Sequence, residues 1–143
     1  MISLNQLDLV CRDVDKSIAF YRLLGVKIPA SAAWRTKTGA HHVRIGFDDT
    51  VELALDSQKL ARAYNASYRG GSRGNVVIGF EVGTRRAVDA LYRKMTAAGH
   101  RGLQPPWDAF WGSRYAIVED PDGNAVGLMS PVDPKNRSAG PEL

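Results

Sequence analysis

Polar side chains that can exchange protons or form hydrogen bonds lie on one set of alternate positions in three short stretches of the sequence. Alternation of this kind places the recurring side chains on one face of a β-strand. On such a face a carboxylate can act as a general base or a hydrogen-bond acceptor, and an imidazole can do the same or bind a metal ion. These residues are Gln6 and Asp8 in the first stretch, His42 and Arg44 in the second, and Glu52 in the third.

Aromatic side chains form the second group of candidate binding residues. Trp107, Phe110 and Trp111 lie close together in the sequence, and Met129 ends the last apolar run. Tryptophan and phenylalanine bury large apolar areas and rarely gather in a solvent-facing loop without a partner. The cluster therefore predicts a surface that packs against something. Trp34 stands alone, and two interpretations are open for it: a cover over a binding site, or ordinary loop packing.

Alternating apolar residues predict the strands that hold the polar group. Each of these runs has apolar side chains on one face and polar or small ones on the other, as in a half-buried strand. The turn formers of 120–124 join the last two runs into a hairpin. The predicted strands are 3–11, 26–28, 41–47, 51–55, 77–82, 115–119 and 125–129, and the predicted loops are 29–39 and 103–112.

Apolar residues at helical spacing predict the helices. Asp13 and Thr84 are suited to cap the N-termini of the two longer helices, because their side-chain oxygens can accept from the first free amides. Gly25 and Gly99 follow them, as expected for residues that end a helix. The predicted helices are 14–24, 58–68 and 85–98.

The two halves of the chain repeat one order of elements: a strand, a helix, then two or three antiparallel strands. A half of this size leaves one face of its sheet uncovered, so we expect it to need a mate. The glycine- and serine-rich segment between the halves is typical of a linker, and the proline-rich end is typical of a flexible tail. The predicted organisation is a first module at 1–68, a linker at 69–74, a second module at 75–131 and a tail at 132–143.

Bulk properties exclude several classes of protein. The 143 residues, 44% of them hydrophobic, suit one globular domain or two small halves. No run approaches the ~20 apolar residues of a membrane span, and the N-terminus lacks the features of a secretory signal. The single cysteine, Cys11, cannot form an intramolecular disulfide and favours the cytoplasm. The net charge of +4 predicts a solvated basic surface, because no nucleic-acid-binding motif accompanies it.

Two stretches allow a comparison with a known family: QLDLVCRDVDKSIAFYRLLGV at 6–26 and WGSRYAIVEDPDGNAVGLMSP at 111–131. They resemble the start and the end of the two βαβββ modules of the vicinal oxygen chelate superfamily, which includes glyoxalases, bleomycin resistance proteins and extradiol dioxygenases. The resemblance implies an α+β fold in which two βαβββ modules form a curled mixed sheet around a cavity. It also implies a homodimer, with or without exchanged modules, that shares this cavity.

The metalloenzymes of that family take metal ligands from the first and last strands of each module. By the motif, these positions are Gln6, Glu52, Val77 and Gly127. A divalent metal needs nitrogen, oxygen or sulfur donors, and valine and glycine side chains offer none. We therefore expect the family metal site to be lost and no cofactor to be bound. A weaker alternative is a rearranged metal site formed by Gln6, His42 and Glu52.

If Gln6 and Glu52 face the cavity, alternation decides which other side chains face it. The opposite face is then wholly apolar, as needed beneath the helices. The cavity face is mixed and contains several glycine and alanine residues, which leave volume for a ligand. In the alternative interpretation, the tryptophan and phenylalanine cluster plugs the cavity. The cavity-facing residues are Gln6, Asp8, Val10, His42, Arg44, Glu52, Ala54, Val77, Gly79, Ala125, Gly127 and Met129.

The resemblance and the missing metal donors together predict a non-catalytic protein that sequesters an aromatic or amphipathic antibiotic-like molecule, for resistance or self-protection. We expect neither a nucleic-acid partner nor a membrane partner. One alternative is a metal-dependent lyase, isomerase or dioxygenase, and another is a metal-free enzyme with Glu52 as general base. The predicted ligand-binding residues are Gln6, Asp8, Trp34, His42, Arg44, Glu52, Trp107, Phe110, Trp111 and Met129.

Overall fold

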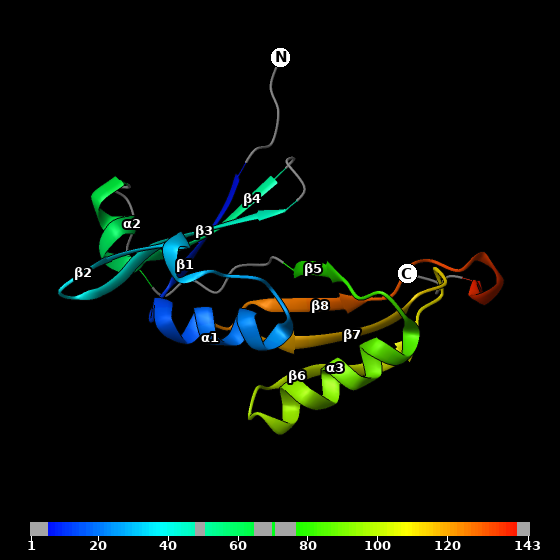
Figure 1. Ribbon diagram of the computed structural model, residues 1–143. Coiled ribbons are helices and arrows are strands. Elements are labelled where there is room, and N and C mark those ends of the chain that lie inside the picture. The colour runs from blue at the N-terminus through cyan, green and yellow to red at the C-terminus, as the bar shows by residue number, and fades with distance from the viewer. Residues whose placement is uncertain (1–5, 48–50, 65–69, 71–76, 140–143) are drawn as a thin grey trace, which may run out of the picture. The chain divides into compact units, whose positions relative to one another are not determined.

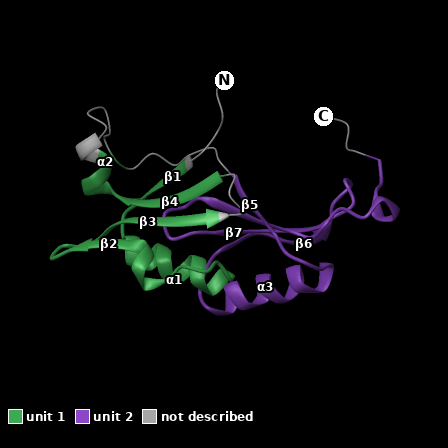
Figure 2. Cartoon of the chain, turned by 45° about the horizontal axis from the view of Figure 1, so that its top comes forward, with its two compact units in different colours: residues 1–72 green, residues 73–143 purple. Residues whose placement is uncertain are grey.

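The chain forms two compact units, residues 1–72 and residues 73–143, coloured green and purple in Figure 2. The computed structural model describes residues 6–47, 51–64, 70 and 77–139, with residues 6, 47 and 62–64 described by their backbone alone. Each unit contains one four-stranded sheet. The two units are therefore considered one at a time.

The first unit is a mixed sheet with the strand order β1-β4-β3-β2. β1 runs parallel to β4, whereas β3 is antiparallel to both of its neighbours. Helix α1 packs against β3 and β4, and Figures 1 and 2 show α1 and α2 on opposite sides of this sheet. The elements are β1 (Gln6–Cys11), α1 (Val14–Leu24), a 3-10 turn η1 (Ala30–Ala32), β2 (Ala33–Thr36), β3 (Gly39–Phe47), β4 (Val51–Ser57) and α2 (Gln58–Tyr64).

Local chemistry explains where α1 begins and ends. The Asp13 carboxylate accepts a hydrogen bond from the Lys16 backbone amide at 3.1 Å, which satisfies one of the free amides of the first turn. Gly25 adopts a φ of 114°, a left-handed conformation that ends the helix. Phe20 and Tyr21 are fully buried, and each contributes about 2–3 kcal/mol of hydrophobic free energy.

The second unit repeats the arrangement, with the strand order β5-β8-β7-β6 and with β5 parallel to β8. Helix α3 packs against β6, β7 and β8, and Figure 1 shows it along one side of this sheet. Thr84 caps α3 by accepting from the Ala87 amide at 3.1 Å. The elements are β5 (Val77–Glu81), α3 (Arg85–Ala97), β6 (Gly102–Asp108), β7 (Arg114–Glu119), β8 (Ala125–Met129) and a 3-10 turn η2 (Pro134–Asn136).

The predicted α+β class is confirmed, with two βαβββ halves in sequence order. Two segments predicted to be loops, however, contain strands. β6 includes Pro105 and Pro106, which have no backbone amide to donate to a neighbouring strand. β6 lies at the edge of its sheet, where one side of a strand needs no partner, and its pairing with β7 is irregular. β2, which holds Trp34, is likewise an edge strand with a register shift.

Four further segments differ from expectation or lie partly outside the described residues. Residues 26–28 form no strand. The helix predicted at 58–68 is described only to Tyr64, and within the predicted linker 69–74 only Gly70 is described. Residues 132–139 of the predicted flexible tail make specific hydrogen bonds to the loop at 109–113, including Asp133 amide to Gly112 carbonyl at 3.1 Å.

Candidate functional site

The structure places the predicted polar residues of the first unit on one face of its sheet. Gln6 pairs with Glu52 across β1 and β4, Asp8 pairs with Ala54, and Arg44 of β3 pairs with Ala54 from the other side. Residues paired in this way share a face. The other face packs against α1 and contains buried Leu9, Cys11, Val43, Ile45, Leu53 and Leu55. We call the polar face, which lies on the side of the sheet where α2 packs, the open face.

An unpredicted carboxylate joins this face. Asp56 pairs with His42 across β4 and β3, and its Oδ1 lies 2.5 Å from His42 Nδ1. Asp56 is only 3% exposed, so its partner matters, because an isolated buried carboxylate is costly. The strand predicted from the sequence ends at Leu55, one residue before Asp56, so Asp56 was not among the predicted site residues. The available signal was the alternation itself, which continues from Glu52 through Ala54 to Asp56.

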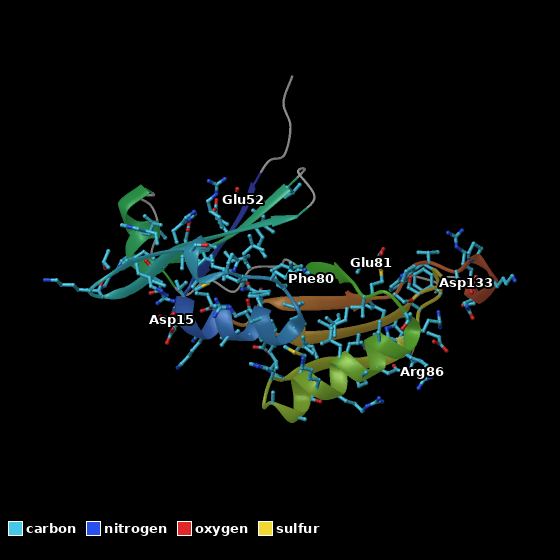
Figure 3. The ribbon with its side chains drawn as sticks, viewed as in Figure 1. Asp15, Glu52, Phe80, Glu81, Arg86 and Asp133 are labelled. Atoms are coloured by element: carbon cyan, nitrogen blue, oxygen red, sulfur yellow. The ribbon has the colours of Figure 1, made fainter. Side chains whose placement is uncertain are left out.

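Arg44 and Glu52 form the second polar pair of the open face. Arg44 Nε and Nη2 donate to the two carboxylate oxygens of Glu52 at 2.9 and 2.7 Å, a bidentate arrangement. This hydrogen bonding lowers the pKa of Glu52, burial opposes the shift, and positive charges on Arg44 and on protonated His42 add to the lowering. Figure 3 shows Glu52 at the side of this sheet away from α1. Glu52 is thus held as a carboxylate already engaged by a cation.

His41, the neighbour of His42, belongs to a different environment. Its Nδ1 lies 2.9 Å from the Ser57 hydroxyl, and its Nε2 lies 2.7 Å from Thr36 Oγ1 and 2.9 Å from Thr38 Oγ1. The ring of Trp34 lies against the His41 ring with centroids 5.4 Å apart. Trp34, which is 53% exposed, pairs with His42 across β2 and β3, and its ring contacts the ring of His41.

The second unit gathers the aromatic candidates around one ring. Trp111 makes edge-on contacts with Trp107, Phe110 and Tyr115, with ring centroids 5.7, 5.1 and 5.3 Å apart. Edge-to-face pairs of this kind are a preferred aromatic geometry. Trp107 remains 37% exposed, so the cluster retains an accessible ring. We call these four residues the aromatic cluster; Tyr115 was not predicted as a member.

Tyr115 also covers the position where the family motif places a metal ligand. A β-carbon at Gly127 would lie 2.9 Å from the Tyr115 hydroxyl oxygen and 3.1 Å from its Cε2. Burial raises the pKa of the Tyr115 phenol, which stays protonated. Met129 pairs with Tyr115 across β8 and β7. The aromatic cluster and Gly127 therefore belong to one side of this sheet.

The strand register gives a second correspondence between the two halves, beside that of the family motif. Gln6 pairs with Glu52, but Val77 pairs with Ala125, while Gly127 pairs with Gly79. The family motif matches Glu52 of the first half with Gly127 of the second. Strand pairing instead matches Glu52 with Ala125, two residues earlier. Both positions lie on the same face, because side chains alternate with a period of two, and neither provides a donor.

These residues do not fit the metal site of the family. Both oxygens of Glu52 are engaged by Arg44, and Nδ1 of His42 is engaged by Asp56. Val77 lacks a donor, and Tyr115 fills the space above Gly127. Over the described ranges no three His, Cys, Asp or Glu side chains are grouped to hold a metal ion. The side chain of Gln6 lies outside the described residues.

Charged residues and the chain end support the loop of the aromatic cluster. Arg114 donates to Asp89 at 2.8 Å and to Asp108 at 3.1 Å, and Asp108 also pairs with Arg85. From the chain end, Arg137 Nε donates to the Trp111 carbonyl at 3.2 Å. Figure 3 places Asp133 in the terminal segment at the end of this unit. The aromatic cluster is therefore built on a braced loop.

Two βαβββ units, each with one face covered by a helix, define a two-module α+β protein. A family model described as the Glyoxalase/Bleomycin resistance protein/Dioxygenase superfamily matches residues 3–128, and the chain belongs to this superfamily. Among the helices of the described residues, none is long and apolar enough to cross a membrane.

Solved structures agree with this assignment. A hypothetical protein from S. aureus is 27% identical, with a TM-score of 0.71 over 91% of this chain and 94% of that one. An enzyme of the glyoxalase/bleomycin resistance protein/dioxygenase family from Burkholderia phytofirmans PsJN is 20% identical, with a TM-score of 0.75 over 90% and 98%. A lactoylglutathione lyase from Agrobacterium tumefaciens is 20% identical, with a TM-score of 0.64 over 92% and 95%. The last two show the fold alone. No curated relative matches the chain.

Proposed function

We propose that this protein binds and sequesters an aromatic or amphipathic small molecule of antibiotic type without transforming it. The observation that carries the proposal is the contact between Tyr115 and Gly127, which puts an aromatic ring where the family motif places a metal-binding carboxylate. Trp111 packs on this ring, and Trp107 remains partly exposed beside it. Such a surface favours the stacking of a flat molecule, at about 0.5–1.5 kcal/mol per ring pair beyond area burial.

The polar residues have a separate role in this proposal. Asp8, His42, Arg44 and Glu52 share the open face of the first sheet, where they offer both donors and acceptors. Polar groups of this kind can fix the orientation of a molecule that lies on this face of the first unit. Gln6 joins them by its place in β1.

Tryptophan fluorescence tests the proposal directly. A panel of aromatic antibiotics is titrated into the protein, and at least one is expected to change the emission with saturation. The change should be lost in Trp107→Phe or Trp111→Phe, whose rings belong to the aromatic cluster. A panel that leaves the emission unchanged, or changes it as much in both variants as in the wild-type protein, contradicts the proposal.

The alternative is a metal-dependent lyase, isomerase or dioxygenase with a rearranged site. The adjacency of Gln6 and Glu52 across β1 and β4 favours it, because two positions with donor side chains remain side by side. Elemental analysis of protein purified without chelators separates the two functions. Stoichiometric metal, or activity gained on adding nickel, zinc, manganese or iron(II), would replace the binding proposal with this one.

The proposal includes a cytoplasmic location and a homodimer, with or without exchanged modules. The single thiol, which belongs to the buried Cys11, agrees with a reducing compartment. Light scattering coupled to size exclusion is expected to give twice the mass of one chain. A monomer at all concentrations would remove the dimer from the proposal and leave the binding surface of each unit in place.

A further inference from the structure

A row of four side chains crosses the sheet of the second unit and includes two members of the aromatic cluster. Glu81 of β5 pairs with Met129 of β8, and Met129 pairs with Tyr115 of β7. Tyr115 pairs in turn with Trp107 of β6. Side chains paired in this way share a face, and Figure 3 shows Glu81 on the side of this sheet away from α3. We call these four residues the Glu81 row.

Glu81 gives the row a negative charge at one end. The residue is exposed, and among the residues that the structure describes no cation is paired with its carboxylate. A glutamate in contact with solvent is ionised at neutral pH, where it accepts hydrogen bonds and attracts cations. The row therefore offers a bound molecule a carboxylate as well as an aromatic surface.

The rings of the row favour the same sign of charge. The face of an indole or phenol ring is its electron-rich side and attracts an ammonium group. Trp107 is 37% exposed, and Met129 adds a polarisable thioether between the rings and the carboxylate. Carboxylate and rings together thus favour a positively charged ligand group over a negative one.

The cations near the aromatic cluster leave this preference in place, because carboxylates already balance them. Arg114 and Asp108 pair across β7 and β6 next to Tyr115 and Trp107, so alternation puts their side chains on the other face, toward α3. Arg114 donates there to Asp108 and to Asp89, and Arg85 of α3 also pairs with Asp108.

Space beside the carboxylate and a cation at the loop decide how a ligand would lie. Gly79 is on the same face two residues before Glu81, and a β-carbon there would meet nothing within 4 Å. At the loop, Arg137 donates to the Trp111 carbonyl from the chain end. Repulsion by Arg137 directs the positive group of a ligand toward Glu81.

We propose that the Glu81 row and Trp111 bind an aromatic amine, whose ring lies on the aromatic cluster and whose ammonium group lies at the Glu81 carboxylate. Neighbouring strands are about 4.8 Å apart, so roughly 10 Å separate Glu81 from Tyr115 across the sheet. A fused ring with a short alkylammonium chain spans this distance. The ring-binding part rests on the proposed function, and the choice of charge rests on Glu81.

Equilibrium dialysis with three matched probes tests the charge preference. The probes 4-(2-naphthyl)butylamine, 4-(2-naphthyl)butanol and 4-(2-naphthyl)butanoate share one ring and one chain but are positive, neutral and negative at neutral pH. The wild-type protein should retain the amine at least about fivefold better than the alcohol, and the carboxylate least. Raising the salt to about 1 M should shrink this preference, because Glu81 is exposed. Equal retention of the three probes, or retention of none, overturns the inference.

Variants of Glu81 locate the preference. Glu81→Gln should lower retention of the amine to that of the alcohol, and Glu81→Lys should favour the carboxylate probe instead. The control is Glu119→Gln: this carboxylate lies on the same face but is already paired with Arg101, so the preference should stay. Unchanged retention of the alcohol shows that the ring surface is intact. An equal loss of the amine preference in Glu81→Gln and Glu119→Gln overturns the assignment.

The antibiotic panel of the proposed function separates the two possible failures. Saturable binding of an antibiotic together with equal retention of the three probes leaves the proposed function in place and overturns the role of Glu81. A preference for the amine that depends on Glu81, without binding of any antibiotic, supports this site and removes the antibiotic from the proposed function.

Discussion

The ring of Tyr115 lies over Gly127, so that a β-carbon at residue 127 would stand 2.9 Å from the tyrosine hydroxyl oxygen. This distance is shorter than an ordinary contact between two such atoms, so one of the two groups has to move if residue 127 gains a side chain. Glycine at 127 and tyrosine at 115 therefore form a matched pair across β8 and β7. The pair replaces a potential ligand side chain with an aromatic surface.

The first prediction concerns this pair. Gly127→Ala should lower the free energy of unfolding by about 1 kcal/mol, measured by urea denaturation, because the added methyl group displaces Tyr115. In a Tyr115→Phe background the cost should be smaller, since the nearest atom is gone. Gly79, which pairs with Gly127, is the control: a β-carbon there meets nothing within 4 Å. Equal costs in both backgrounds would show that the two residues are not coupled.

The second prediction concerns Gly112, where the chain end docks. Its φ is +102°, and a β-carbon there would lie 2.5 Å from the carbonyl oxygen of Asp133. Gly112→Ala should cost about 2–3 kcal/mol, because it adds backbone strain to a clash with a backbone atom. Gly39→Ala, at a φ of +115° with open space around it, should cost only about 1 kcal/mol.

The same Gly112 variant should also release the chain end. Hydrogen exchange at the amides of Asp133 and Ser138, which donate to the Gly112 and Phe110 carbonyls, should become faster in Gly112→Ala and stay unchanged in Gly39→Ala. Slow exchange at both amides in Gly112→Ala would mean that the terminal segment is held by other contacts.

The third prediction concerns the pH dependence of the Arg44–Glu52 pair. Hydrogen bonding from Arg44 lowers the pKa of Glu52 below its ordinary value of 4.5. A carboxyl group whose pKa is lower in the folded state stabilises the fold above that ordinary value, and the contribution disappears as the pH falls through the folded-state pKa. The Tm difference between wild type and Glu52→Gln should therefore be largest above about pH 5 and shrink below about pH 4. In Arg44→Met, the part of the Tm that is lost on acidification of the wild-type protein should also be absent. A Tm difference between wild type and Glu52→Gln that grows toward low pH would contradict the stabilisation of the Glu52 carboxylate by Arg44.

The fourth prediction concerns the ion pairs beneath the aromatic cluster. Arg114 and Asp89 have side chains 25% and 31% exposed and lie 2.8 Å apart. Arg114→Met should cost about 1–3 kcal/mol, because it leaves Asp89 partly buried without its cation. The control is Arg35→Met, whose partner Asp15 is about half exposed, and its cost should stay near or below about 0.5 kcal/mol. A double-mutant cycle with Asp89→Asn measures the coupling itself.

The alternation of side chains predicted much of the candidate site. A strand period of two was enough to place Asp8, His42, Arg44 and Glu52 on one face, and the structure has them there. The same period reaches Asp56, but the predicted strand ended at Leu55, two residues before the observed end of β4 at Ser57. Tyr115 was assigned to a strand, yet its contact with Gly127 depends on the register between β7 and β8, which a single strand cannot reveal.

The sequence by itself determined the ends of α1 and α3, the two-module order and the faces of β1, β3, β4, β5, β7 and β8. These properties depend on local chemistry: a capping side chain, a glycine with positive φ, and the fixed periods of helix and strand. Tertiary structure alone decided that Pro105 and Pro106 lie in an edge strand, that His42 meets Asp56 while His41 meets Ser57, and that the chain end braces the Trp111 loop. These contacts join residues far apart in the chain, so their geometry depends on strand pairing and packing across the whole unit.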